Sequence, residues 1–170
     1  MNNVLVAGCT NSRGFKLTKF LINRGFSVFG VDRFLNDEVG KSVRYFRIDL
    51  RHPQSMDLVM QVAKPTTVIF CPDINLNRDS FTNIDYSYIA YLNLLMCSAK
   101  FNVKNLILCV DEIKTDPKTP MELTQLSLKI MTDIFSSHEN FKSLVITKES
   151  NLLKEVKKFL LSENTEEVTT

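Results

Sequence analysis

The chain has 170 residues, of which 44% are hydrophobic and 24% charged, and its formal net charge is +2. This length fits one domain that can bury a hydrophobic core, and the composition is typical of a globular protein. The charge provides no basic surface of the kind that binds nucleic acid, and the apolar runs are shorter than a membrane span, so we expect neither a nucleic-acid nor a membrane partner.

Short apolar segments alternate with amphipathic segments along the chain. The apolar segments predict strands at Val4–Ala7, Val28–Val31, Tyr45–Ile48, Thr67–Cys71, Leu106–Val110 and Leu144–Thr147. The amphipathic segments predict helices at Gly14–Arg24, Pro53–Ala63, Ile84–Phe101, Pro120–Ser137 and Ser150–Leu161. This alternation favours an α/β fold with a parallel sheet covered on both faces. We assign residues 1–161 to a single domain and residues 162–170 to a flexible polar tail.

The first strand runs into a glycine-containing turn that precedes a helix. Gly8 and Gly14 supply the first and third glycines of a GxxGxxG motif, and Asn11 stands in the place of the second. Such a turn lets the backbone approach a pyrophosphate and packs the helix tightly against the sheet. Asparagine tolerates a left-handed backbone, but its side chain would intrude on the surface that phosphates approach, so we expect weakened binding.

The second predicted strand ends in a carboxylate, Asp32. A carboxylate at this place accepts hydrogen bonds from an adenosine ribose and disfavours a 2′-phosphate. Asp32 therefore favours NAD over NADP as the cofactor, although Arg13 and Arg33 are cations that would suit the extra phosphate. The strand, the glycine turn, the helix and Asp32 together predict a Rossmann-type doubly wound parallel sheet of about six strands.

From residue 3 to residue 148 the sequence resembles the extended short-chain dehydrogenase/reductases. These are the NAD-dependent epimerase/dehydratases, which include UDP-galactose 4-epimerase. The resemblance is best in residues 4–32, in Ile48-Asp49-Leu50, and in Asn93-Leu94-Leu95 followed by residues 102–107. It implies an NAD(P)-binding Rossmann domain.

The resemblance also implies which residues bind the cofactor. The pyrophosphate would face Gly8, Asn11, Ser12, Arg13 and Gly14. Asp32, followed by Arg33, would bind the ribose, and the adenine would lie beside Asp49 and Leu50. Other residues beside the cofactor would be Asn93, which matches the family's helix asparagine, and the replacements for its HLA-type turn, Phe70, Cys71 and Pro72.

The catalytic positions of this family are largely replaced. The family transfers a hydride with a Ser or Thr, a Tyr and a Lys, and here Gln125 occupies the Tyr position of YxxxK while Lys129 matches the Lys. Glutamine cannot exchange a proton near neutral pH. Asp111 or a neighbour stands where the family places its serine, and an ionised carboxylate would repel a developing alkoxide. Lys129 is the remaining candidate catalytic residue, with an ordinary surface lysine as the competing interpretation.

Two further observations weigh against catalysis. If the alignment at Lys129 slips, the remaining candidate acids are Tyr86, Tyr88 and Tyr91, but their positions on the preceding helix favour packing. Family members continue into a smaller domain that closes over the substrate, whereas one predicted helix follows Lys148 in this sequence. We therefore expect that a water-excluding active site is hard to build from this chain alone.

The function remains open between two hypotheses. The favoured one is a non-catalytic or regulatory dinucleotide-binding protein, a pseudoenzyme that senses NAD(H) or works through a partner. The alternative is an active NAD-dependent nucleotide-sugar epimerase or reductase in which water, Lys129 or a partner's residue replaces the Tyr. A folded relic without a ligand is also compatible with the sequence.

A partner would bind through the predicted helices at residues 84–101 and 120–137. We expect a homodimer, or a heterodimer with a full-length active relative. The apolar residues available for this contact are Tyr88, Leu92, Leu95, Met96, Leu123, Leu126, Ile130 and Ile134. The same residues would equally suit the core.

Cysteine and histidine residues show no metal-binding pattern. His52 and His138 lie in polar loops and are interpreted as surface residues, so no metal is predicted. Buried free thiols are expected at Cys9, Cys71, Cys97 and Cys109, which lack CxxC spacing. Met1–Leu5 lacks the charged start and apolar core of a signal peptide, which favours a cytoplasmic location.

Overall fold

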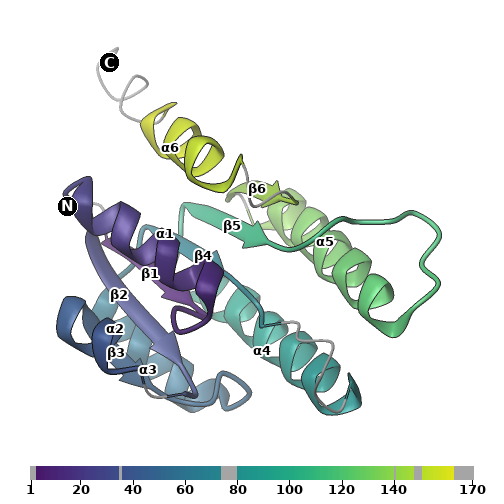
Figure 1. Ribbon diagram of the computed structural model, residues 1–170, viewed down its shortest axis with the longest axis horizontal. Helices are drawn as coiled ribbons and strands as arrows, with labels where there is room; N and C mark the ends of the chain where they lie inside the picture. Colours follow the sequence, from purple (N-terminus) through teal and green to yellow (C-terminus); the bar gives the residue numbers. More distant parts are fainter. Residues whose placement is uncertain (1–2, 35, 74–79, 140, 148–150, 163–170) are drawn as a thin grey trace.

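Six parallel strands form one sheet in the order β3-β2-β1-β4-β5-β6. The strands are β1 (Asn3–Ala7), β2 (Ser27–Asp32), β3 (Arg44–Arg47), β4 (Thr67–Phe70), β5 (Asn105–Cys109) and β6 (Lys142–Ile146). The computed structural model describes residues 3–34, 36–73, 80–139, 141–147 and 151–162 (Figure 1). The chain builds outward from β1 to β3, returns to β4 and builds outward again to β6, so the predicted doubly wound sheet is confirmed.

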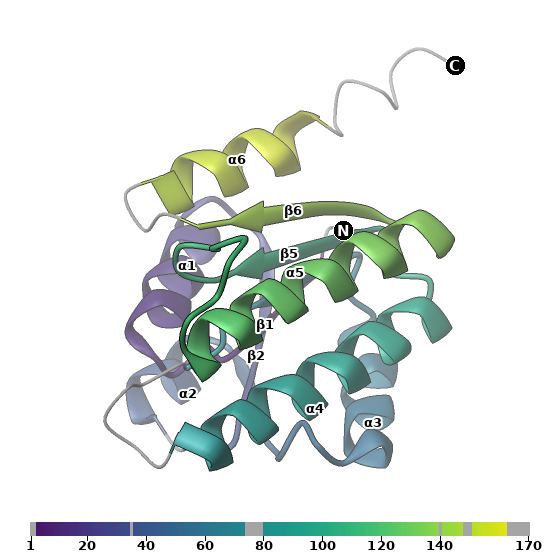
Figure 2. The same cartoon turned by 90° about the vertical axis from the view of Figure 1, so that its right-hand side faces the viewer.

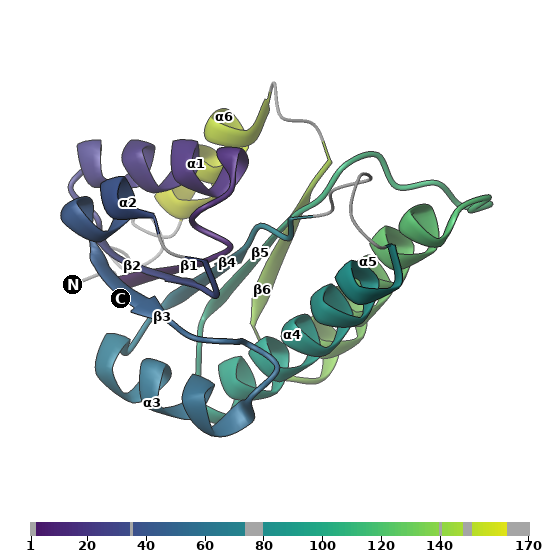
Figure 3. The ribbon, with the colours of Figure 1, turned by 60° about the horizontal axis from the view of Figure 1, so that its bottom comes forward.

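Helices cover both faces of this sheet. They are α1 (Ser12–Asn23), α2 (Asp37–Ser42), α3 (Pro53–Ala63), α4 (Ser80–Lys100), α5 (Pro120–His138) and α6 (Leu152–Ser162). Figure 3 shows α1, α2 and α6 on one side of the sheet and α3, α4 and α5 on the other. The predicted tail lies outside the described residues, apart from Ser162.

The central strands are buried on both faces, which explains their unbroken apolar sequences. Along β1, Leu5 and Ala7 join the core beneath α3, α4 and α5. Val4 and Val6 point to the opposite face and pack in the core beneath α1 and α6. The edge strand β3 is only half-buried.

Several elements begin at different residues from those predicted. Helix α1 starts at Ser12, ahead of Gly14, because the side chain of Asn11 accepts a hydrogen bond from Gly14 N–H and caps the helix. Strand β6 starts at Lys142, ahead of Leu144, and α4 starts at Ser80, ahead of Ile84. The predicted start of the last helix, Ser150, lies outside the described residues.

Helix α2 was not predicted. It has only six residues and contains a glycine, so its apolar periodicity is too short to recognise. Its start is nevertheless marked by Asn36, whose side chain accepts hydrogen bonds from the N–H groups of Glu38 and Val39. Asn36 could have indicated the start of this helix in the sequence, whereas apolar periodicity alone did not reveal it.

All four cysteines are buried free thiols, as predicted. Three of them, Cys9, Cys71 and Cys109, belong to the core beneath α1 and α6, just beyond or at the carboxyl ends of β1, β4 and β5. Among the described residues, no group of three or more His, Cys, Asp or Glu side chains could hold a metal ion. None of the described helices has the length and apolarity needed to cross a membrane.

Candidate functional site

The carboxyl ends of β1 and β4 mark the point where the sheet changes direction. The chain leaves β1 for α1 on one face and leaves β4 toward α4 on the other face (Figure 3). In doubly wound sheets a crevice forms at this point and is the usual place for a ligand. The residues that follow β1, β2 and β4 converge here.

Gly8 and Gly14 are required by close approaches within the protein itself. A Cβ on Gly8 would lie 1.9 Å from Cys71 O, and the φ of Gly8 is +81°. A Cβ on Gly14 would lie 2.0 Å from Gly8 O. The two glycines therefore bring the turn after β1 against β4 and seat α1 on that turn, which is the backbone arrangement predicted from the motif.

Asn11 does not use the left-handed conformation that the glycine of the motif would allow. Its backbone is extended, with φ −75° and ψ 165°. Its side chain turns back into the protein, because Oδ1 accepts from Gly14 N–H at 2.8 Å and Nδ2 donates to Cys71 O at 2.7 Å. The asparagine thus caps α1 and ties it to β4.

The start of α1 retains donors for an anion. The backbone N–H groups of Ser12 and Arg13 make no hydrogen bond to the residues that the structure describes. They lie at the positive end of the helix dipole, where phosphate groups bind in many proteins. The Ser12 side chain is exposed beside them.

Asp32 is only 6% exposed and is held in place by hydrogen bonds. Its Oδ2 accepts from the Thr10 hydroxyl at 2.7 Å, and its Oδ1 accepts from Arg33 N–H at 2.7 Å. These contacts fix the carboxylate beside the turn after β1. A carboxylate so placed can still accept hydrogen bonds from a ribose hydroxyl, because each oxygen has two lone pairs.

A small cavity of about 20 Å³ opens beside Asp32. Its lining includes residues predicted at several parts of the cofactor. Asp32, Arg33 and Leu50 were predicted on the adenosine side, Gly8 at the pyrophosphate, and Phe70, Cys71 and Pro72 elsewhere beside the cofactor. This volume is about that of one water molecule and is much smaller than an adenine base. The walls must therefore move to admit a nucleotide.

Tyr86 forms one wall of this cavity. The sequence had indicated it only as a fallback candidate acid and not as a cofactor-site residue. The Arg33 guanidinium stacks on its ring at 4.0 Å from the ring centroid, and the Arg51 guanidinium lies 5.4 Å away. Burial raises the pKa of the Tyr86 phenol to about 12, with the carboxylates of Asp32 and Asp49 contributing. The i, i+7 spacing between Tyr86 and Asn93 places both on one face of α4 and could have indicated its position.

Two of the predicted adenine-side residues are engaged in contacts within the protein. Asp49 forms a bidentate ion pair with Arg51, and hydrogen bonds from the Arg51 guanidinium hold the pKa of that carboxyl below its usual value. Asn93 donates to Leu50 O at 3.0 Å and joins α4 to the segment after β3. These contacts shape the edge of the cavity.

On the other side of the crevice the two replaced catalytic positions meet. Gln125 Nε2 donates to Asp111 Oδ2 at 3.4 Å, so the residues in the Tyr and Ser positions contact each other. Arg13 pairs with Asp111 Oδ1 and donates to Cys109 O at 3.2 Å. A polar network thus runs from the turn after β1 to the loop after β5.

Lys129 lies apart from this network. Its ammonium group pairs with Asp133 one turn along α5, and the two side chains are 41% and 53% exposed. Tyr91 is fully buried, stacks on Phe70 and shares a 2.6 Å hydrogen bond with Thr132. Tyr88 is exposed on α4. Within the part of the chain that the structure describes, neither Tyr91 nor Lys129 has a hydrogen bond or ion pair with Gln125 or Asp111.

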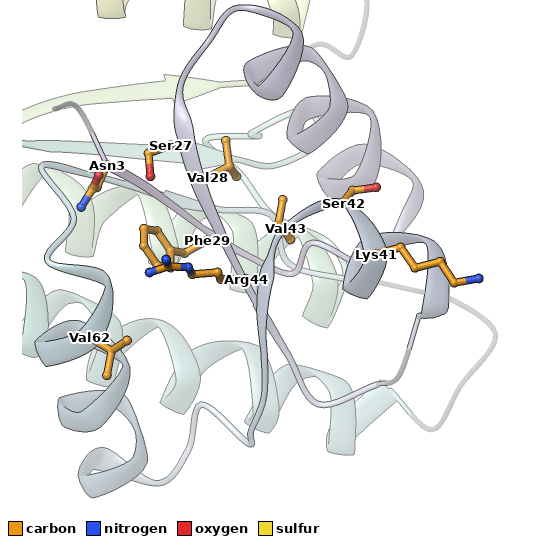
Figure 4. Close-up of a pocket in the computed structure, with 9 residues that line it drawn as sticks. All are labelled: Asn3, Ser27, Val28, Phe29, Lys41, Ser42, Val43, Arg44 and Val62. Carbon is orange, nitrogen blue, oxygen red and sulfur yellow. The ribbon is translucent and has the colours of Figure 1, made fainter.

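A larger hollow lies at the opposite end of the sheet. It has a volume of about 590 Å³ and is bordered by the first residues of β1, β2 and β3, Asn3, Ser27 and Arg44. Figure 4 shows that the Lys41 amine points away from it, while Arg44 lies over Phe29. Its polar groups do not converge on a common point, so the crevice remains the better candidate site.

The fold and the crevice define an α/β protein of the Rossmann type. A family model for the NAD-dependent epimerase/dehydratase family matches residues 4–110. The match spans more than half of the chain, and the protein belongs to this family. It ends before Asp111, Gln125 and Lys129, the positions where the catalytic residues of the family are expected.

Solved structures share this fold. The UDP-glucose 4-epimerase of Thermotoga maritima, solved with UDP-glucose, is 19% identical with a TM-score of 0.78 over 86% of this chain and 55% of its own. The UDP-glucose 4-epimerase of Thermus thermophilus, solved with NAD, is 20% identical with a TM-score of 0.75 over 85% and 54% of the two chains. The L-threonine dehydrogenase of Clostridium difficile is 14% identical with a TM-score of 0.76 over 86% and 53%.

The protein spans about half the length of these structural relatives. Comparison with curated protein sequences finds no match. The family supports a nicotinamide dinucleotide as the cofactor class.

Proposed function

We propose that this chain is a non-catalytic, regulatory member of its family that binds a dinucleotide without transferring a hydride. The observation that carries the proposal is the contact between Gln125 and Asp111. A glutamine amide does not exchange protons near neutral pH, and an ionised carboxylate opposes the negative charge that develops on a reacting oxygen. Neither position can take the role of the group it replaces.

No other described side chain supplies the missing acid in that place. Lys129 is paired with Asp133, and Tyr91 is buried in the core. Tyr86 lies on the adenosine side of the crevice, and its raised pKa of about 12 makes it a poor proton donor at neutral pH. These placements support a protein that binds a dinucleotide without transferring a hydride.

The preferred cofactor in this proposal is NAD. The fixed carboxylate of Asp32 suits a ribose with two free hydroxyls, and it would repel the 2′-phosphate of NADP. The donors at the start of α1 suit the pyrophosphate. Asp32 is therefore the residue that selects between the two dinucleotides.

The first experiment is a calorimetric titration with NAD, NADH and NADP, followed by assays for reduction of NAD by UDP-glucose and for epimerisation of UDP-glucose. We expect NAD to bind more tightly than NADP and no turnover to follow. In Asp32→Asn the preference for NAD over NADP should fall about tenfold, since the repelling charge is gone. The matched control Asp116→Asn removes an exposed carboxylate elsewhere and should leave the preference unchanged.

The same experiment can overturn the proposal. Reduction of NAD by the nucleotide sugar, or its epimerisation, would establish an active enzyme, and Lys129→Ala would then test whether the lysine takes part. Failure of NAD, NADH and NADP to bind at millimolar concentration would refute dinucleotide binding.

We further propose that the protein forms a homodimer through α4 and α5. These helices lie side by side (Figure 2). Among the side chains that the structure describes, they expose six large apolar ones, which we call the apolar face: Tyr88, Ile89, Met96, Leu123, Ile130 and Ile134. Leu95 was predicted to contribute but is fully buried in the core, so it is unavailable to a partner. A second copy would cover the apolar face isologously.

A further inference from the structure

The polar network around Arg13 fills the half of the crevice that would hold the second nucleotide of a dinucleotide. We infer that the site selects its ligand by the adenosine diphosphate portion, so that free ADP binds more tightly than NAD. This inference rests on the proposed nucleotide-binding function and deepens it. A doubly wound sheet has two mononucleotide-binding halves, one over β1–β3 and one over β4–β6, and a dinucleotide needs both.

The path of the Arg13 side chain shows how the second half is filled. Arg13 belongs to the turn after β1, whereas its partners Cys109 O and Asp111 lie at and beyond the end of β5. In the sheet β4 separates β1 from β5, so the side chain crosses the end of β4. We call the linked side chains of Arg13, Asp111 and Gln125 the bridge. A nicotinamide riboside attached to the pyrophosphate would have to displace it.

Displacing the bridge is costly because its members satisfy one another. Asp111 accepts from Arg13 through Oδ1 and from Gln125 through Oδ2. The Gln125 side chain is almost fully buried, and the Arg13 side chain is 17% exposed. Removing either partner leaves a largely buried polar group without its hydrogen bond.

The charge of the bridge favours a free terminal phosphate. The terminal phosphate of ADP carries more negative charge than the corresponding phosphate of NAD, which is esterified on both sides. Arg13 lies at the start of α1, where its own N–H and that of Ser12 have no partner among the described residues. A guanidinium has more N–H donors than its two recorded contacts use, so Arg13 can reach a terminal phosphate while keeping Asp111.

The adenosine half, in contrast, keeps groups suited to a base and ribose. Asp32 offers acceptors, and Leu50 and Phe70 supply apolar walls. The buried Nε of Arg33 has no hydrogen-bond partner within the described part of the chain, and an acceptor on the base would satisfy it. The Tyr86 and Arg33 side chains must open for any adenine nucleotide, and this cost is the same for ADP and for NAD.

The test is a calorimetric titration of the whole chain with ADP and, separately, with NAD. We expect ADP to bind about tenfold more tightly or better, because one charge-assisted contact is gained and the bridge is kept. In Asp111→Ala the bridge is lost, and the ratio of the two dissociation constants should fall, because NAD no longer has a bridge to displace. In Arg13→Met the affinity for ADP should fall about tenfold, with a smaller change for NAD.

Glu112→Ala is the matched control, because it removes an exposed carboxylate from the adjacent position. It should preserve the preference for ADP. Asp111 is itself half exposed, so its truncation leaves the fold intact, and circular dichroism of each variant verifies this.

Equal or tighter binding of NAD by the unmodified chain would overturn this inference and leave the proposed function standing. The inference would also be overturned, and the proposed function left standing, if Asp111→Ala showed the same ratio of dissociation constants as the control Glu112→Ala. If neither ADP nor NAD binds at millimolar concentration, the proposed function fails together with the inference.

Discussion

At the scale of single residues, Asn11 shows how a motif can change and keep its structure. A glycine in the motif would have contributed no side chain, whereas Asn11 makes two hydrogen bonds, one to Gly14 N–H and one to Cys71 O. The asparagine stabilises the helix start and ties it to the neighbouring strand. It does so without occupying the N–H groups of Ser12 and Arg13.

This role predicts the effect of removing the side chain. Asn11→Ala should lower the free energy of unfolding by about 1 to 2 kcal/mol, because both the cap and the contact with Cys71 are lost. Urea denaturation followed by circular dichroism measures the change. Ser12→Ala, at the adjacent exposed position, should change it by less than about 0.5 kcal/mol. Equal stability of Asn11→Ala and the unmodified chain would contradict the assigned cap.

Residue patterns predicted the backbone of the crevice better than its side chains. Gly8, Gly14 and Asp32 could be placed because each depends on the local sequence around a strand end. The contacts of the Tyr86 ring with two arginines depend on how α4 packs over the sheet. The i, i+7 spacing from Asn93 could have placed Tyr86 on the same face of α4, but no local pattern specifies how that face packs over the sheet.

At the scale of elements, α5 begins with a complete capping box. The Thr119 hydroxyl accepts from Glu122 N–H, and the Glu122 carboxylate accepts from Thr119 N–H and pairs with Lys114. Pro120 occupies the first turn, as the sequence predicted. The start of α5 anchors the loop that carries Asp111. It thereby fixes the position of Asp111 relative to Gln125, which lies on α5.

This cap makes the stability of the protein depend on pH. The Lys114 ammonium and the N–H groups of Lys118 and Thr119 lower the pKa of Glu122 to about 2. A carboxyl with a depressed pKa stabilises the fold above its ordinary pKa of 4.5, and this contribution is lost as the pH falls toward about 2. Glu122→Gln should therefore have a lower urea midpoint at pH 7, and the difference should shrink over that range.

The comparison of urea midpoints at several pH values needs a control on the same helix. Glu139→Gln changes an exposed glutamate at the other end of α5, and its midpoint should stay close to that of the unmodified chain at neutral pH. If the urea midpoints of Glu122→Gln and the unmodified chain differed by the same amount from pH 7 down to pH 2, the charge of the Glu122 carboxylate would not contribute to stability.

The strands and long helices were the most predictable elements. Their apolar runs and amphipathic repeats arise from burial on two faces or one face, and burial follows from the sheet that they build. Helix α2 could not be predicted from such a repeat, because its six residues make fewer than two turns. The ends of elements shifted wherever a side-chain cap such as Asn11 decided the boundary.

At the scale of the whole molecule, the apolar face on α4 and α5 is the feature that calls for a partner. Ile130→Glu should raise the dissociation constant of the proposed dimer by about tenfold or more, since burial of one isoleucine contributes about 1.5 to 3 kcal/mol. Sedimentation velocity over a range of concentrations measures this constant. Leu58→Glu is the control, because Leu58 is equally apolar and 63% exposed but lies on α3. A chain that sediments as a monomer at every concentration would rule out the homodimer.

The reactivity of the four buried cysteines can report how fast the folded structure opens. Every thiol lies within the core or a helix interface. Burial raises the pKa of Cys9 and Cys97, and a hydrogen bond with Cys109 together with burial raises the pKa of Cys71, so very little reactive thiolate is present in the native state. A thiol-specific reagent can then react only at the rate at which the surrounding structure separates. Because Cys71 and Cys109 lie beneath the crevice and Cys97 lies on α4, the order in which they become labelled reports which part of the molecule loosens first.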